Sequence, residues 1–123
     1  ENVEGDRQIN SLIVSQLNIN NNEKSINEIK ININTEYKKT INSKDATGAA
    51  ASYELFSKTL LDITKNNKTE RLEVTKKFII DKNDNAFDQD NYEKTVKENF
   101  ASSIVEQLRY KLNSLEWLLN LSK

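Results

Sequence analysis

The sequence contains no cysteine, no histidine and only two glycines. Without cysteine and histidine, the chain has no thiol nucleophile, no histidine-based triad, and no zinc or iron site built from these residues. Disulfides are excluded as well, so the cysteine count does not separate one cellular compartment from another. Two glycines are too few for a glycine-rich nucleotide-binding loop. These absences predict a protein that is not an enzyme and needs no cofactor.

The charges are balanced, and no hydrophobic run is long. The 18 Lys and Arg residues against 19 Asp and Glu residues give a net charge of −1, so no overall field favours nucleic acid or an acidic membrane. No run of about 18 apolar residues is present, which excludes a transmembrane helix. No segment of the chain as given has the form of a signal peptide.

The length of 123 residues fits a single domain that can bury a core of its own. We interpret residues 6–114 as an α+β core. Residues 1–5 are interpreted as a tail or the remnant of an N-terminal strand, and residues 115–123 as an apolar extension of the last helix.

The stretch from Ala51 to Asp81 has the pattern of two long β-strands joined by a tight turn. In the second arm, apolar residues alternate with polar ones, as in a sheet with one buried face: Leu72, Val74, Phe78 and Ile80. In the first arm a similar alternation is interrupted at Ser57 and Thr59. The asparagines between the arms tolerate the left-handed backbone of a hairpin turn. We predict a hairpin that needs other elements to cover its apolar face.

Before this hairpin, the pattern predicts one helix and one strand. Asp6 is a good N-cap for an amphipathic helix that reaches about Leu17, and residues 18–25 form a loop. Alternation from Ile29 to Asn34, extended through Tyr37, predicts a strand. The small residues of the connection 42–50 predict a mobile turn.

After the hairpin, residues 81–88 begin like a calcium-binding loop. Ala86 stands where that loop requires glycine, and Tyr92 where it requires glutamate, so we expect a polar loop instead. Asp90 and Glu93 fit a capping box. A helix of about 30 residues is predicted to follow, with an apolar stripe formed by Val96, Phe100, Ile104, Leu108, Leu112, Leu115 and Leu119.

The order helix, strand, strand, strand, helix favours a two-layer α+β sandwich. In this arrangement, two helices pack on one face of a three- to four-stranded, mostly antiparallel sheet.

Three blocks of sequence resemble the lipopolysaccharide-assembly lipoprotein family LptE of Gram-negative bacteria, especially its alphaproteobacterial branch. The segment Arg7–Leu17 (RQINSLIVSQL) resembles the first helix of the family. Asp45–Leu55 (DATGAAASYEL) is similar to its small-residue turn before a Tyr-x-Leu strand. Phe87–Tyr92 (FDQDNY) with Ala101–Leu112 (ASSIVEQLRYKL) resembles the closing helix. Together with the strand order, the resemblance covers nearly all of residues 5–112.

This resemblance implies a periplasm-facing domain that a lipid anchors to the outer membrane. It implies a plug inside the β-barrel LptD that helps deliver lipopolysaccharide to the cell surface, with a structural and binding role. Family members begin with a signal peptide, a lipid-modified cysteine and a first strand. We expect the present chain to be a mature domain without the lipid-bearing cysteine and with most of that strand missing.

Basic residues of the family implicated in lipopolysaccharide binding fall, by spacing, on Ala46 and Gln89, which are not basic. Lys44 and Lys82 lie close by in sequence and are predicted to substitute for them. A second candidate anion-binding set consists of basic residues in the second arm of the hairpin: Arg71, Lys76 and Lys77. The alternative for that set is an ordinary solvated strand face.

Aromatic and apolar residues supply the candidate partner contacts. Tyr37 and Tyr53 are candidates for contact with a barrel wall, against the alternative of packing within the sheet. Trp117, Leu118 and Leu121 form an apolar helix end, typical of a docking surface. A competing hypothesis is therefore a soluble α+β interaction domain that dimerises through this end. A third hypothesis, an enzyme using Asp or Glu pairs, has no particular pair to support it.

Overall fold

The computed structural model describes residues 3–19 and 29–121, with side chains described over 6–17 and 29–114. The elements, in chain order, are β1 (Val3–Gly5), α1 (Arg7–Ile19), β2 (Lys30–Lys44), β3 (Ala50–Lys65), β4 (Lys68–Asp81) and α2 (Ala86–Leu121). Residues 20–25 of the loop predicted before the first strand lie outside the described residues.

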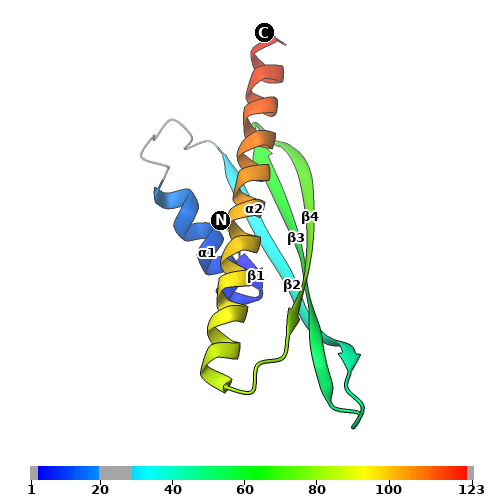
Figure 1. Ribbon diagram of the computed structural model, residues 1–123. Helices are drawn as coiled ribbons and strands as arrows, with labels where there is room; N and C mark the ends of the chain where they lie inside the picture. The colour runs from blue at the N-terminus through cyan, green and yellow to red at the C-terminus, as the bar shows by residue number, and fades with distance from the viewer. Residues whose placement is uncertain (1–2, 20–28, 122–123) are drawn as a thin grey trace.

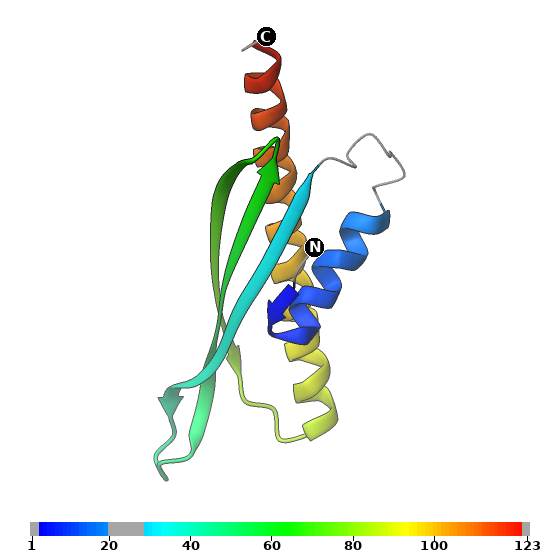
Figure 2. The ribbon, with the colours of Figure 1, turned by 180° about the vertical axis from the view of Figure 1, so that it is seen from behind.

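The strands form one sheet in the order β1-β2-β3-β4. The three long strands are antiparallel, whereas the short β1 runs parallel to β2, from Val3 opposite Ile33 to Gly5 opposite Thr35. Both helices cover the same face of this sheet, as the two opposite views show (Figures 1 and 2). The predicted two-layer α+β sandwich is thereby confirmed.

Local sequence explains the β3–β4 turn. Asn66 and Asn67 have φ angles of 53° and 65°, the left-handed conformation that a two-residue hairpin turn requires at both positions. Lys65 pairs with Lys68 on either side of the turn. The predicted position of this hairpin is confirmed.

The β2–β3 connection is shorter than the sequence predicted, because β2 continues to Lys44 and leaves a turn over residues 45–49. The Oδ1 atom of Asp45 accepts hydrogen bonds from the backbone N–H groups of Thr47 and Ala49. These bonds fix the small-residue segment as a defined turn. Gly48 adopts φ 89° within it, a conformation that glycine supplies without strain.

The core lies between the helices and the covered face of the sheet. Its largest fully buried side chains include Ile33, Leu55, Leu61 and Ile80 from the strands and Ile9, Ile13, Ile104 and Leu108 from the helices. Ser57 and Thr59, which interrupt the apolar alternation, are fully buried on this same face. The hydroxyls of Thr59 and Thr35 lie 2.9 Å apart in a hydrogen bond, which offsets the cost of burying them.

Helix α2 begins earlier than the sequence predicted, at Ala86. The Oδ1 atom of Asn85 accepts hydrogen bonds from the N–H groups of Phe87 and Asp88, so Asn85 is the N-cap and Asp90 lies inside the helix. The capping box predicted at Asp90 is therefore wrong. Within the described residues, neither helix is long and apolar enough to cross a membrane.

The position of the cap gives a first testable prediction. Asn85→Ala is expected to lower the free energy of unfolding by about 1 kcal/mol, because the first N–H groups of α2 lose their acceptor. Asp90→Ala, the matched control, is expected to change it by less than about 0.5 kcal/mol. Urea unfolding followed by circular dichroism measures both. A larger loss for Asp90→Ala than for Asn85→Ala would restore the later helix start.

Candidate functional site

Two predicted basic residues meet at one end of the sheet, which we call the hairpin end. It comprises the last residues of β2 and β4, the β2–β3 turn, the loop 82–85 and the first two turns of α2. Lys44 ends β2 opposite Ala50, and the backbone N–H of Lys82 donates to the carbonyl of Ala51. Lys44 and Lys82 therefore flank the start of β3 from its two sides, although 37 residues separate them in sequence.

A carboxylate at this end interacts with one of the two lysines. The pKa of Asp45 is lowered, mainly by the hydrogen bond from the Thr47 hydroxyl, then by the backbone N–H groups of Thr47 and Ala49, with a contribution from the charge of Lys82. Asp45 thus remains ionised and occupied within its own turn. The ammonium groups of the two lysines are left exposed beside it.

Exposed apolar side chains gather at the same end. Six large hydrophobic side chains are exposed among those described, and five of them lie on the last residues of β2 and β4 or the first turns of α2: Ile41, Phe78, Ile79, Phe87 and Tyr92. Ile41, Ile79 and Phe87 each expose more than half of their surface. Apolar surface at the same end as exposed lysines is suited to a ligand with acyl chains and anionic head groups, or to a partner protein.

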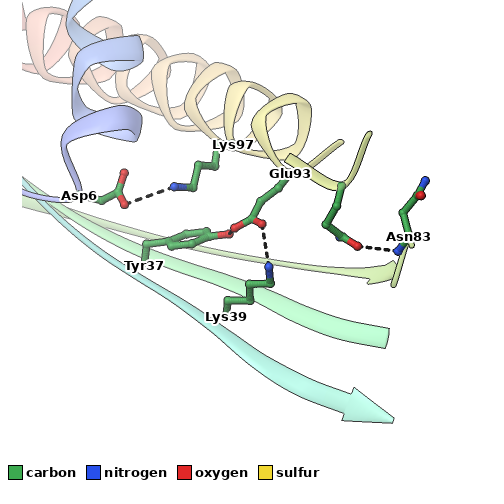
Figure 3. A network of polar contacts seen from close by, with 7 residues as sticks. Asp6, Tyr37, Lys39, Asn83, Glu93 and Lys97 are labelled. Atoms are coloured by element: carbon green, nitrogen blue, oxygen red, sulfur yellow. Dashed lines mark hydrogen bonds and ion pairs between the residues drawn. The ribbon is translucent and has the colours of Figure 1, made fainter. Parts of the chain in front are cut away.

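A polar network joins α2 to the sheet at the border of this end (Figure 3). The hydroxyl of Tyr37 on β2 donates to Glu93 Oε1 at 2.6 Å. The ammonium of Lys39 donates to Glu93 Oε2 at 3.1 Å. Lys97 lies over the Tyr37 ring, 4.1 Å from its centroid, and 3.6 Å from Asp6 at the start of α1. The network therefore connects α1, β2 and α2.

Burial and neighbouring charges shift the pKa values of this network. Burial alone would raise the pKa of Glu93, but hydrogen bonds from Tyr37 and Lys39 and the charges of Lys39 and Lys97 more than offset it, so the pKa is lowered. The pKa of Tyr37 is raised by burial and then by its bond to Glu93 and by the nearby negative charges. At neutral pH the pair is a neutral phenol donating to a carboxylate, a fixed structural contact.

The loop 82–85 is fixed by a buried glutamine. The Oε1 atom of Gln89 accepts a hydrogen bond of 2.6 Å from the backbone N–H of Asn83, and the Gln89 side chain is only 9% exposed. Gln89, one of the two positions matched by spacing to a basic residue of the family that the sequence resembles, therefore shapes the loop. Ala46, the other position, is exposed in the β2–β3 turn.

The structure does not bring Arg71, Lys76 and Lys77 together. Arg71 lies near the opposite end of β4, about 35 Å from Lys82 along the strand, and its guanidinium binds Asp62 at 2.7 and 3.0 Å. Lys76 and Lys77 are consecutive in a strand, so their side chains point to opposite faces. The solvated strand face is thus the better interpretation for this set.

The predicted partner contacts have different outcomes. Tyr37 is half-buried, and its hydroxyl is taken up by the bond to Glu93, which agrees with the alternative of packing within the fold; its contact with a barrel wall stays a prediction. Tyr53 is also half-buried, with Lys39 lying 4.6 Å from its ring centroid. The side chains of Trp117, Leu118 and Leu121 lie outside the described ones, and their contact role stays a prediction.

Sequence reasoning missed the exposed apolar residues of the hairpin end. Phe78 has the parity of the buried face, as predicted, yet it is 45% exposed, whereas Ile80, two residues further along the same face, is 1% exposed. The signal available was the apolar run Phe78–Ile80 at the end of an otherwise charged arm. The role of Glu93 in the network required knowledge of how α2 crosses β2.

No protein-family model matches the chain, and no curated protein sequence does either. Among solved structures, the crystal structure of rare lipoprotein B from Shewanella oneidensis is similar, with a TM-score of 0.70, 12% sequence identity and coverage of 97% of each chain. At this low sequence identity, the similarity shows a shared fold only. It supports the LptE-like fold predicted from the sequence and gives no support to the alphaproteobacterial branch in particular.

Proposed function

We propose that this chain is the periplasm-facing domain of an outer-membrane lipoprotein of the LptE type. In this role it plugs and supports the LptD barrel and takes part in lipopolysaccharide transport. The observation that carries the proposal is the fold likeness to rare lipoprotein B over 97% of both chains, since rare lipoprotein B is another name for LptE. A plug contributes shape and contacts, which fits a chain without cysteine and histidine.

Lipopolysaccharide is an amphiphile with phosphate groups and acyl chains, and the hairpin end offers features that match both parts. Lys44 and Lys82 supply cations on either side of β3. Ile41, Phe78 and Phe87 supply apolar surface beside them. Charge-assisted hydrogen bonds from lysine to phosphate are about twice as strong as neutral ones, so we assign head-group contact to these two lysines.

The barrel partnership is tested by purifying the full-length lipidated protein from detergent-solubilised outer membranes and identifying its companions by mass spectrometry. We expect a large β-barrel subunit in near-equal amount. Recovery of the lipoprotein alone, at detergent concentrations that keep other outer-membrane complexes intact, would overturn the proposal.

The second testable prediction concerns the two lysines. Reversing both charges, Lys44→Glu with Lys82→Glu, is expected to weaken binding to lipopolysaccharide by at least about tenfold, because phosphates would then face carboxylates. The matched control reverses two lysines at the opposite end of the sheet, Lys65→Glu with Lys68→Glu, and should change binding by less than about twofold. Fluorescence titration with labelled lipopolysaccharide measures both. An equal loss in both double variants would point to non-specific attraction, and no loss in either would remove the hairpin end from the binding site.

A further inference from the structure

Strand β4 is an open edge of the sheet. It pairs with β3 along its whole length, from Lys65–Lys68 to Ser52–Asp81, and it stands last in the strand order. Within the described residues no strand pairs with its other side, and both views show that side uncovered (Figures 1 and 2). A row of backbone N–H and C=O groups is therefore available for pairing with another strand.

Protection of this edge is uneven. From Lys68 to Lys77 the strand carries six charged side chains, a usual defence against edge pairing. The segment Phe78–Ile80 carries none, and its register with β3 has no bulge. Phe78 and Ile79 are 45% and 52% exposed. The apolar, unprotected part of the edge is therefore confined to its last residues.

The hydrogen-bond parity identifies the backbone groups that point outward. The Lys82 N–H donates to Ala51 O, so even-numbered residues of β4 direct their backbone groups toward β3, and odd-numbered residues direct theirs outward. The two-residue turn closed by Lys65 and Lys68 gives the same parity, since the pair that closes such a turn is hydrogen-bonded. The outward groups in the apolar segment thus belong to Lys77, Ile79 and Asp81.

We propose that a second copy of this chain pairs with β4 in antiparallel fashion, on a two-fold axis through Ile79. This alignment sets Ile79 opposite its own counterpart and Lys77 opposite Asp81 of the second copy. It joins odd-numbered residues to odd-numbered ones, so each such pair exchanges two backbone hydrogen bonds through groups that already point outward. Phe78 then lies opposite Ile80 of the second copy.

Charge complementarity favours a second copy of the chain as the partner of this edge. Lys77 and Asp81 are exposed and have no ion pair within the described residues, and the two-fold alignment gives each an opposite charge directly across the strands. The same alignment sets Lys76 opposite Lys82 of the second copy, and this repulsion ends the pairing beyond Asp81. An edge contact of about five residues per copy is small, so a dissociation constant on the order of 10 µM to 1 mM is expected.

This inference stands apart from the proposed function, since it depends only on β4. Sedimentation equilibrium of the purified chain from ~10 µM to ~1 mM is expected to show a concentration-dependent dimer. Ile79→Lys puts two like charges on the axis and is expected to weaken the dimer at least about tenfold. The matched control is Ile41→Lys. Ile41 lies on β2 and is 53% exposed, close to the 52% of Ile79. This variant should leave the dimer intact.

Two charge-reversal variants test whether Lys77 and Asp81 face each other across the dimer. Lys77→Asp alone and Asp81→Lys alone each place like charges opposite one another and should be monomeric at concentrations where the original chain dimerises. An equimolar mixture of these two variants places opposite charges at both positions and is expected to restore the dimer as a heterodimer. A general loss of folding in either variant would prevent this rescue, so the mixture separates a lost contact from a lost fold.

Three results would overturn the proposal. One is a monomer at every concentration. Another is a dimer that Ile79→Lys leaves unchanged. The third is a dimer that Trp117→Asp disrupts and Ile79→Lys does not, which would place the contact at the apolar end of α2 instead.

Discussion

Replacing Phe100 by alanine is expected to lower the free energy of unfolding by about 3–5 kcal/mol, the usual cost of removing a buried phenylalanine side chain. Phe100 is 4% exposed, within the core between α2 and the sheet. Its loss removes apolar burial and leaves a cavity that the surrounding side chains fill only in part. Because single domains are stable by only about 5–15 kcal/mol, this one substitution is expected to remove a large share of the total.

The same helix provides the control. Phe87 is 71% exposed, so Phe87→Ala is expected to change stability by less than about 0.5 kcal/mol. Urea titration followed by circular dichroism compares the two variants, with equal slopes as the check that both unfold in the same way. Similar losses for Phe87→Ala and Phe100→Ala would contradict the assignment of Phe100 to the core and of Phe87 to the hairpin end.

The second large effect is expected at Glu93. Glu93→Gln removes the charge that accepts hydrogen bonds from Tyr37 and Lys39 and that faces Lys97. The Glu93 side chain in its ion pair with Lys39 is 16% exposed, so water compensates only in part. A loss of about 1–3 kcal/mol at pH 7 is expected for hydrogen bonds to a charged group of this kind.

The pH dependence of this effect has a definite sign. The pKa of Glu93 is lowered in the folded protein, so the folded state favours the carboxylate more than the unfolded chain does. The resulting stability is present above the unfolded pKa of about 4.3. It is lost as the pH falls through the lower folded pKa. The difference between the original chain and Glu93→Gln should therefore shrink as the solution is acidified below about pH 4.

Other carboxylates also titrate in this range, and the comparison removes their contribution because both proteins share them. Glu98→Gln, at an exposed position of the same helix, is the control and should track the original chain at every pH. Urea unfolding at a series of pH values gives the measurement. A Glu93→Gln difference that stays constant from pH 7 to pH 3 would exclude the proposed coupling of Glu93 to its donors.

Patterns that operate over a few residues predicted much of the fold. The Asp6 cap is observed, since Asp6 Oδ1 accepts a hydrogen bond from Ile9 N–H at 2.9 Å, and the Asn66–Asn67 turn adopts the predicted left-handed backbone. The start of α2 was predicted wrongly. The sequence analysis considered Asp90 alone as the cap, whereas the structure uses Asn85, a residue type that is equally good at this position.

The candidate site was less predictable, because it depends on contacts between distant segments. Lys44 and Lys82 were identified through the resemblance to the LptE family. Their positions on the two sides of β3 follow from the registers of the β2–β3 and β3–β4 hairpins. Lys76 and Lys77 were grouped with Arg71 by proximity in sequence, although a strand sends neighbouring side chains to opposite faces. The burial of Tyr37 was set by the path of α2, which no local pattern encodes.

The two layers of the fold are offset along their length: the β2–β3 hairpin extends past the start of α2, while α2 extends past the β3–β4 turn (Figures 1 and 2). Residues 38–49 are all exposed, although Lys39 reaches α2 through its ion pair with Glu93. Amide hydrogens in this arm are therefore expected to exchange with solvent by local opening, at a lower free energy than those of the helix-covered residues 55–63. The exposed arm of the β2–β3 hairpin is therefore expected to open locally while the helix-covered part of the sheet stays folded.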